Sequence, residues 1–211
     1  MTPRARLERG LEQLALALPA RACEKLQQYL ELIAKWNRTY NLTAIRDPER
    51  MVTHHVLDSL AVLPHLPMRD SDRLADAGSG AGLPGVPLAI ARPGWQVTLN
   101  EASEKKAAFL RQAAIELDLD NVAVECGRVE RWRPQSGFAV VISRAFAELA
   151  RFIDSCRHLL APAGSLAAMK GAYPRAELAA VPAGCDCGRV IALDVPFLGA
   201  ERHLVLCRFA S

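Results

Sequence analysis

The chain lacks the features that mark several common protein classes. Its 211 residues contain no apolar run near the roughly 20 residues that span a bilayer, and the alternately charged N-terminus has no signal-peptide core. Repeats and low-complexity tracts are absent, and the net charge is only +3. With 51% hydrophobic and 23% charged residues, the composition is that of an ordinary soluble, cored protein. We therefore expect a cytoplasmic protein without membrane contact, built as one domain or as one domain with an extension.

The six cysteines contain no C-x-x-C pair, which argues against a zinc site. Cys185 and Cys187 are two residues apart, while His54 and Asp58 have the i, i+4 spacing of helical metal ligands without an evident third ligand. We therefore predict no metal site and a reducing compartment. Three cysteines lie in apolar or helical runs, where a free cysteine is a common core residue: Cys126, Cys156 and Cys207.

The positive charge is concentrated at the N-terminus. Residues 1–55 hold nine Lys/Arg and six Asp/Glu, whereas residues 56–211 hold seventeen of each. This excess of three indicates either an anionic partner or simply a solvated helical surface.

Apolar residues at helical spacing predict an N-terminal helical extension over residues 1–67, ahead of a second unit at 68–211. Asp47 is a suitable N-cap, with Pro48 in the first helical turn. Helices are expected over residues 3–17 and 21–38, and from Asp47 to about residue 63.

From residue 73 onward, strand and helix patterns alternate, which predicts an α/β fold with a mostly parallel sheet. The last two strands are joined by residues 196–201, too few for a parallel crossover, so they should form an antiparallel hairpin. Expected strands are 73–77, 95–101, 122–126, 138–143, 165–170, 188–195 and 202–209. Expected helices are 84–92, 103–117, 147–160 and about 175–181.

A glycine-rich stretch from Asp76 to Gly85 follows the first of these strands. Glycine permits positive φ and close approach of a ligand, so a strand, this loop and the next helix form a cradle for a nucleotide-like cofactor. Glu101 ends the second strand, 19 residues after Gly82, and is placed to accept hydrogen bonds from ribose hydroxyls. The loop residues predicted to bind the cofactor are Gly78, Gly80 and Gly82.

Two enzyme classes compete for this loop: nicotinamide or flavin enzymes, and methyltransferases that use S-adenosylmethionine. Asp76 would be unwelcome beside a dinucleotide pyrophosphate, but it suits the positively charged methionyl end of S-adenosylmethionine. The terminal hairpin and the single glycine turn also favour the second class. We therefore predict a Rossmann-like class I S-adenosylmethionine methyltransferase, with an NAD-type oxidoreductase as the alternative.

Motifs spread over most of the chain carry a resemblance to a known family, at residues 35–37, 40–43, 55–59, 76–85, 105–111, 128–130, 142–146, 170–171 and 199–203. On these motifs the sequence resembles the bacterial small-subunit ribosomal RNA methyltransferase G family, also known as glucose-inhibited division protein B. The resemblance implies N7-methylation of the guanine at position 527 of 16S ribosomal RNA. It also implies cofactor contacts at Gly78, Leu83, Val129, Glu130 and Arg144. Asn100-Glu101 departs from the Leu-Asp that relatives can have, which leaves ribose contact possible with a longer side chain.

The chemistry of guanine N7 agrees with the absence of a catalytic dyad. N7 carries a lone pair in the neutral base, so methyl transfer needs positioning rather than a general base, and we predict no catalytic acid or base. Arg144 and Lys170 end strands at the expected active edge and are predicted to position the reactants. Arg144 has an alternative reading as the partner of Asp76 or Glu148, and Lys170 as a solvated side chain.

Predicted RNA contacts are Arg144, Lys170, Arg202 and His203. The expected partner is 16S ribosomal RNA within the small ribosomal subunit or its precursor, bound by a monomer. A non-catalytic RNA-binding assembly factor is the remaining alternative.

Overall fold

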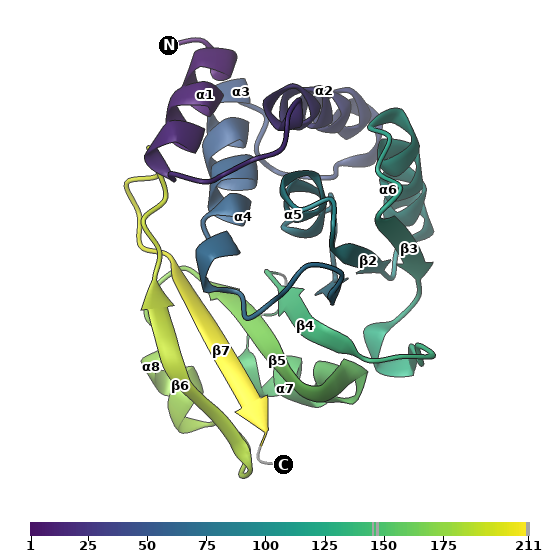
Figure 1. The fold of residues 1–211 in the computed structure, drawn as a ribbon, viewed down its shortest axis with the longest axis vertical. Helices are drawn as coiled ribbons and strands as arrows, with labels where there is room; N and C mark the ends of the chain where they lie inside the picture. Colours follow the sequence, from purple (N-terminus) through teal and green to yellow (C-terminus); the bar gives the residue numbers. More distant parts are fainter. Residues whose placement is uncertain (145, 147, 210–211) are drawn as a thin grey trace.

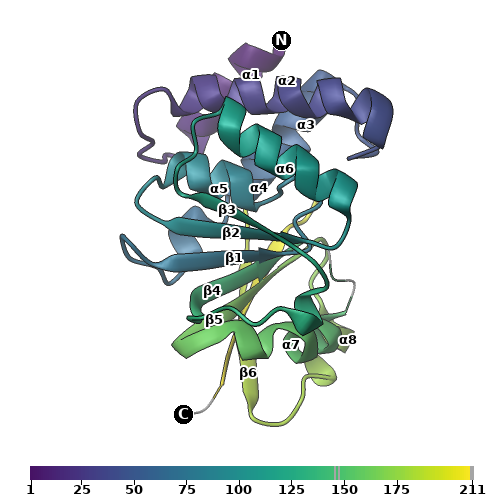
Figure 2. The same cartoon turned by 90° about the vertical axis from the view of Figure 1, so that its right-hand side faces the viewer.

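One seven-stranded sheet with helices on both faces forms the framework of the chain (Figures 1 and 2). The computed structural model describes residues 1–144, 146 and 148–209. The strands are β1 (Arg73–Ala77), β2 (Gln96–Glu101), β3 (Val122–Cys126), β4 (Phe138–Ser143), β5 (Leu160–Lys170), β6 (Cys185–Ala192) and β7 (His203–Phe209). The helices are α1 (Pro3–Gln13), α2 (Ala22–Tyr40), α3 (Pro48–Met51), α4 (Asp58–Leu60), α5 (Gly85–Ala91), α6 (Glu104–Glu116), α7 (Leu149–Cys156) and α8 (Arg175–Ala179).

The strand order is β3-β2-β1-β4-β5-β7-β6. β1 to β5 pair in parallel, while β7 runs antiparallel to both β5 and β6. The predicted parallel sheet with a terminal antiparallel hairpin is therefore confirmed. The order changes direction at β1 and β4, where an open α/β sheet places its ligands beyond the carboxyl ends of the strands.

Two predicted boundaries near the fifth strand are wrong. The helix expected over 147–160 ends as α7 at Cys156, and β5 starts at Leu160 instead of residue 165. The reason is pairing, because Leu160 lies opposite Phe138 in the parallel ladder with β4. The sixth strand lies at Cys185–Ala192 rather than 188–195.

The N-terminal helices also differ in detail from their predicted bounds. α1 ends at Gln13, and Ala15 has a positive φ of 49°. α2 continues to Tyr40, where Asn41 ends it in the left-handed conformation that asparagine tolerates. The predicted cap at Asp47 is confirmed, since its side chain accepts a hydrogen bond from the Arg50 amide at 2.8 Å.

A π-helical stretch, Val52–Leu57, joins α3 to α4 and was not predicted. Such stretches are rare and are frequent at functional sites. His54 and His55 lie in this stretch, directly before Asp58.

Alternate residues of the central strands fill two cores, one on each face of the sheet. On β1, Leu74 belongs to the core under α1, α2, α5 and α6, whereas Ala75 and Ala77 belong to the core under α7. On β4, Ile142 belongs to the same core as Leu74, and Val141 belongs to the core under α7. The apolar composition of these strands on both faces thus follows from coverage by helices on both sides.

The N-terminal helices share the larger core with the sheet. Leu26, Tyr29 and Ile33 of α2 are fully buried in the same cluster as Leu74 and Leu99. The Tyr29 hydroxyl also donates a 2.5 Å hydrogen bond to the carbonyl oxygen of Ala81 in the glycine loop. The extension therefore supports the loop directly.

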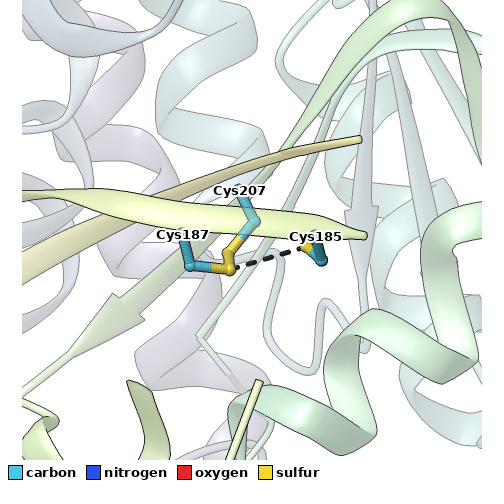
Figure 3. Close-up of side chains that lie close together, drawn as sticks. All are labelled: Cys185, Cys187 and Cys207. Carbon is cyan, nitrogen blue, oxygen red and sulfur yellow. Dashed lines mark hydrogen bonds between the residues drawn. A yellow bond between two sulfur atoms is a disulfide. The ribbon is translucent and has the colours of Figure 1, made fainter. Parts of the chain in front are cut away.

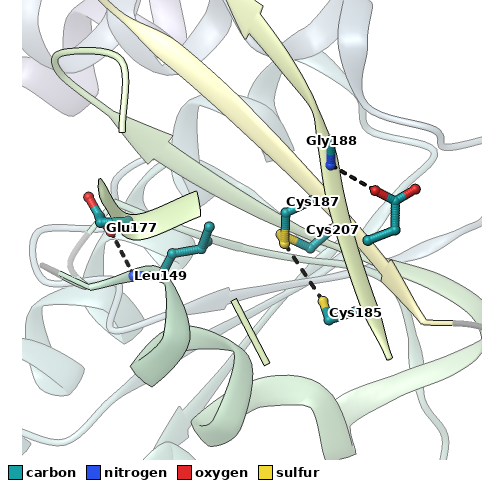
Figure 4. Close-up of a disulfide and its surroundings, with 7 residues drawn as sticks. Leu149, Glu177, Cys185, Cys187, Gly188 and Cys207 are labelled. Atoms are coloured by element: carbon teal, nitrogen blue, oxygen red, sulfur yellow. Dashed lines mark hydrogen bonds between the residues drawn. A yellow bond between two sulfur atoms is a disulfide. The ribbon is translucent and has the colours of Figure 1, made fainter. Parts of the chain in front are cut away.

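The terminal hairpin contains a disulfide bond between Cys187 and Cys207 (Figure 4). The expectation that Cys207 is a free core thiol is therefore wrong. A register shift in β6 places two residues, Cys187 and Gly188, opposite the single residue Cys207. The free cysteines are Cys23, Cys126, Cys156 and Cys185. None of the helices in the described ranges is long and apolar enough to cross a membrane.

Replacing Gly85 by alanine is expected to destabilise the fold strongly. A Cβ at this first residue of α5 would lie 2.3 Å from Leu99 Cδ2 and 3.0 Å from Asp76 Cβ, both in fully buried side chains. Overpacking of this kind costs about 1–3 kcal/mol. Urea unfolding measures the loss. Gly94→Ala is the matched control, because its Cβ would meet nothing closer than 3.6 Å, and an equal loss in both variants would contradict the packing argument.

Candidate functional site

The glycine loop is pinned to the end of β2 by backbone hydrogen bonds. The amides of Gly78 and Ser79 both donate to the Asn100 carbonyl oxygen at 2.9 Å. Gly78 and Gly80 have φ values of 72° and 60°, a region that favours glycine. No atom of residues 1–144, 146 or 148–209 lies within 4 Å of the position that a Cβ would take at Gly80, so this part of the loop is open on that side.

Glu101 holds the loop on one side and the start of α6 on the other. Its Oε2 accepts a 2.9 Å hydrogen bond from the Gly80 amide, and its Oε1 accepts a 2.8 Å bond from the Ser103 amide. A carboxylate oxygen can accept two hydrogen bonds, so each oxygen retains acceptor capacity. Glu101 is 8% exposed, which leaves it accessible from the adjoining cavity.

The first cavity, which we call the β2–β3 cavity, has a volume of about 410 Å³ and lies beyond the ends of these two strands. It brings together four residues predicted to bind the cofactor: Gly78, Glu101, Val129 and Glu130. Its other lining residues were not identified from sequence: Asn100, Ala102, Gly127, Arg128, Phe146, Glu148 and Arg151. Of these, Asn100, Ala102 and Arg128 are next to predicted residues in the sequence.

The second cavity, the loop cavity, has a volume of about 210 Å³ and also borders Gly78. Gly80, Leu83 and Arg144, all predicted to bind the cofactor, line this cavity together. Gly82 lines neither cavity. A Cβ there would meet Val86 Cγ2 at 2.6 Å, so its positive φ of 90° serves the turn inside the protein.

The third cavity, the Asp58 cavity, has a volume of about 420 Å³ and is organised by one buried carboxylate. Asp58 Oδ1 accepts a 2.9 Å hydrogen bond from Arg202 Nε, and its Oδ2 lies 3.3 Å from Arg144 Nη1. Arg144 Nη1 also donates to the His54 carbonyl oxygen at 2.8 Å. The Asp58 side chain is 2% exposed, whereas the two arginines are 29% and 23% exposed and reach the cavity.

The structural partner of Arg144 is therefore Asp58, and neither Asp76 nor Glu148 fills that role. The alternative predicted from sequence is wrong because Asp58 comes from the N-terminal extension, 86 residues earlier in the chain. Periodicity placed Asp58 on a helix but did not indicate which strand end that helix would face.

Lys170 and His203 lie at the same end of the sheet, opposite each other in the β5–β7 ladder. Lys170 Nζ donates to Glu177 Oε2 at 2.7 Å and to the Phe146 carbonyl oxygen at 3.2 Å, so it is not a solvated side chain. The same Glu177 oxygen accepts from the Leu149 amide at the start of α7. Lys170 lines the Asp58 cavity, whereas His203 does not and contacts the Gly171 carbonyl oxygen at 2.8 Å.

His55 completes the inner wall of the Asp58 cavity. Its Nε2 lies 3.1 Å from Thr43 Oγ1, while its buried Nδ1 has no hydrogen-bond partner among the residues that the structure describes. Burial and the charge of Arg144 lower the pKa of His55 to about 4, so the ring is neutral near pH 7. Asn37 Oδ1 accepts from the Thr43 amide at 2.9 Å and thereby holds this segment in place.

Asp76 is fully buried and lines none of the three cavities. Its Oδ2 accepts a 2.9 Å hydrogen bond from the Gly85 amide, while Oδ1 has no hydrogen-bond partner within the described part of the chain. Burial raises the pKa of Asp76 to about 7, although the Gly85 bond and the Arg144 charge act in the opposite direction. Asp76 thus shapes the loop from inside rather than facing a cofactor.

Asp76 and His55 should give opposite pH dependences of stability. The pKa of Asp76 is about 7 in the folded state and 3.8 in the unfolded state, so the folded state binds more protons between these values. The contribution of Asp76 to the free energy of unfolding therefore falls as the pH rises from 3.8 to about 7. His55 is protonated below about pH 6.5 in the unfolded state but only below about pH 4 in the folded state. Its contribution to the free energy of unfolding therefore rises as the pH rises from about 4 to 6.5. Urea unfolding from pH 4 to pH 7.5 should show wild type losing stability relative to Asp76→Asn and gaining it relative to His55→Gln. If the stability of either variant changed with pH in the same way as that of wild type, the pKa shift of the replaced residue would be contradicted.

The three cavities form a series along the carboxyl edge of the sheet. The β2–β3 cavity and the loop cavity share Gly78, and the loop cavity shares Thr43 and Arg144 with the Asp58 cavity. A larger cavity of about 560 Å³ lies near Trp95 and Asn121 and contains none of the predicted residues. We place the site at the carboxyl edge because parallel sheets bind their ligands there.

Metal ligands do not gather at this edge among the described residues. The candidate group of three is Cys185, Cys187 and Cys207, on the terminal hairpin. Asp58 has the spacing of a metal ligand with His54 in the sequence, but in the structure its carboxylate forms ion pairs with Arg144 and Arg202.

The family model for "rRNA small subunit methyltransferase G" matches residues 22–205. A protein named ribosomal RNA small subunit methyltransferase G from Methylobacillus flagellatus is 55% identical over 200 residues, covering 95% of both chains. The protein of the same name from Nitrosospira multiformis is 50% identical over 218 residues, covering both chains completely.

Solved structures with the same fold are more distant in sequence. A SAM-dependent methyltransferase from Aquifex aeolicus aligns with a TM-score of 0.58 at 19% identity, covering 78% of this chain and 94% of its own. The structure of MtNAS in complex with MTA and tNA gives a TM-score of 0.59 at 18% identity, covering 86% and 71%.

Proposed function

The chain belongs to the rRNA small subunit methyltransferase G family, and we propose that it transfers the methyl group of S-adenosylmethionine to N7 of the guanine at position 527 of 16S ribosomal RNA. The observation that carries this proposal is the series of three adjoining cavities. The β2–β3 cavity, with cofactor residues, meets the loop cavity at Gly78, and the loop cavity meets the Asp58 cavity at Thr43 and Arg144. Family membership favours this enzyme over an NAD-type oxidoreductase and over a non-catalytic assembly factor.

The β2–β3 cavity suits the adenosine part of the cofactor. Glu101 has acceptor capacity left for ribose hydroxyls, and Gly80 offers an open backbone face in the adjoining loop cavity. Val129 and Glu130 line the far side of the same cavity, where we propose that the adenine lies. S-adenosylmethionine, when bound, supplies an electrophilic methyl group on its sulfonium.

The Asp58 cavity suits the target guanine and its phosphates. Arg144 and Arg202 are fixed by one carboxylate yet remain partly exposed, which orients guanidinium donors toward RNA. Guanine presents O6 and N7 as acceptors, but a donor on N7 would occupy the lone pair that must attack. We therefore propose that Arg144 contacts O6 or phosphate and leaves N7 free.

The charges around this cavity also suit a reaction that makes the base cationic. Asp58 offsets part of the charge of Arg144 and Arg202, and Glu177 lies 2.7 Å from Lys170. Neutral His55 adds no positive charge near pH 7. Positive charge on the methylated guanine is thereby tolerated next to basic residues that bind RNA.

The proposal is tested with labelled S-adenosylmethionine and small-subunit RNA from a strain that lacks the enzyme. We expect one label, at N7 of the guanine at position 527. Label at another atom or position would refute the assignment of the target, and no label would refute the activity.

We propose further that the chain acts in the cytoplasm as a monomer on the small ribosomal subunit or its precursor. The mild charge of +3 offers little attraction for bare RNA, so selectivity should come from a larger ribonucleoprotein surface. Assembled particles should therefore be methylated faster than a short hairpin of the same sequence. Equal rates would contradict this preference, and light scattering checks the oligomeric state.

A further inference from the structure

Three sulfur atoms gather on one side of the terminal hairpin. Cys187 and Cys207 form the disulfide, and Cys185 Sγ lies 3.7 Å from Cys187 Sγ (Figure 3). All three sulfurs lie within 4.8 Å of one another. Nothing in the proposed methyl transfer uses this cluster.

The strand geometry accounts for the cluster. Cys185 and Cys187 are two residues apart on β6 and therefore project from the same face, while Cys207 lies beside them on β7. β6 is at the edge of the sheet, next to β7. Cys187 and Cys207 belong to the core cluster under α7, and Cys185 packs against that cluster (Figure 4).

The three sulfurs differ in their access to solvent. Cys207 is fully buried and Cys187 is 5% exposed, so neither meets a dissolved thiol or disulfide while the hairpin is folded. Cys185 is only partly buried. A reagent in solution therefore reaches the cluster through Cys185 first.

We propose that the cluster is a thiol–disulfide exchange site in which Cys185 is the entry thiol for closing and opening the Cys187–Cys207 bridge. The oxidant in the closing direction is a low-molecular-weight disulfide such as oxidised glutathione. The site is a modification site of the terminal hairpin, independent of the methyl-transfer residues.

Closing proceeds in three exchanges, each by attack of a thiolate on a disulfide sulfur. The Cys185 thiolate attacks the small disulfide, forms a mixed disulfide and releases one small thiolate. The Cys187 thiolate then attacks the Cys185 sulfur, forms a Cys185–Cys187 bond and releases the second small thiolate. The Cys207 thiolate finally attacks the Cys187 sulfur, which forms the Cys187–Cys207 bond and returns Cys185 as a thiolate. Two protein thiols are oxidised and one small disulfide is reduced to two thiols, and opening by excess small thiol follows the reverse order.

The environment of Cys185 bears on the rate of this exchange. Burial, together with the charge of Asp186, raises the pKa of the Cys185 thiol, so little thiolate exists near pH 7. The structure supplies proximity, since the Cys185 and Cys187 sulfurs are in van der Waals contact. We expect closing on the minutes-to-hours scale of uncatalysed disulfide chemistry.

The test follows bridge formation in the full-length protein. Reduced protein, freed of metal by a chelator, is mixed with oxidised glutathione, quenched with an alkylating agent, and mapped by peptide mass spectrometry. We expect glutathione first on Cys185, followed by the Cys187–Cys207 bridge. Cys185→Ser should slow closing by at least about tenfold, while Cys126→Ser, which alters another partly buried cysteine, should match wild type. Equal closing rates for Cys185→Ser and wild type, or glutathione first on Cys187, would overturn the proposal.

Two further measurements separate the exchange route from a folding defect. In guanidinium chloride, where all cysteines are accessible, Cys185→Ser and wild type should form the Cys187–Cys207 bridge at rates within about twofold of each other. A tenfold difference under these conditions would show that access through Cys185 does not explain the slower closing of the folded variant. In the folded protein, Cys207→Ser should stop at the Cys185–Cys187 bridge or the Cys185 adduct. An unmodified Cys185 in that variant would refute its role as entry thiol.

Discussion

Asp58→Ala should lower kcat/KM for ribosomal RNA by at least about 100-fold. Asp58 is the common partner of Arg144 and Arg202, and its side chain is 2% exposed. Without it, both guanidinium groups lose their fixed orientation and a charged partner. Removing one member of a buried pair costs about 3–5 kcal/mol, but the arginines here are partly exposed, so part of that cost is relieved by water.

The effect should appear mainly in RNA binding and turnover. Steady-state methylation gives KM for RNA and kcat, and calorimetry with S-adenosylhomocysteine gives the cofactor affinity, which we expect to change little. Asp58→Asn keeps an acceptor oxygen and should lose less activity than Asp58→Ala. Asp194→Ala, an exposed carboxylate on the chain before β7, is the control and should match wild type. An unchanged kcat/KM in a folded Asp58→Ala protein would show that Asp58 does not organise the RNA side of the site.

Glu101→Ala should weaken binding of S-adenosylmethionine by at least about 100-fold, equivalent to about 2.7 kcal/mol. The carboxylate accepts hydrogen bonds from the amides of Gly80 and Ser103, and hydrogen bonds to a charged group contribute about 1.5–3 kcal/mol each. Its loss releases the loop from α6 and also removes the proposed ribose contact. The same variant should bind RNA almost as well as wild type.

Glu101→Asp tests the length of this side chain. It keeps the carboxylate but shortens the reach by one methylene, so we expect a loss of less than about tenfold. Glu104→Ala is the matched control, because Glu104 lies three residues later at the start of α6 and is 79% exposed. Calorimetry with S-adenosylhomocysteine measures all three affinities. Equal affinities for Glu101→Ala and Glu104→Ala would remove Glu101 from the cofactor site.

The class of fold and the cofactor loop follow from short-range patterns in the sequence. Strands β1, β3 and β4 have the predicted bounds because each is a short apolar run between turn signals. The hairpin β6–β7 follows from the length of its connection, and the loop from its glycines. Gly78, Glu101, Val129 and Glu130 meet in one cavity because the carboxyl ends of parallel strands lie at one edge.

Contacts between distant segments were decided only by tertiary structure. Arg144 pairs with Asp58 across 86 residues and Tyr29 reaches Ala81 across 52, and no local pattern encodes which helix faces which strand end. The same holds for the Cys187–Cys207 bond, which depends on a register shift between β6 and β7. Spacing and propensity act over a few residues, so the sequence by itself determined the elements and the edge of the sheet at which the site lies. Packing of the N-terminal helices against the sheet decided which residues line the Asp58 cavity.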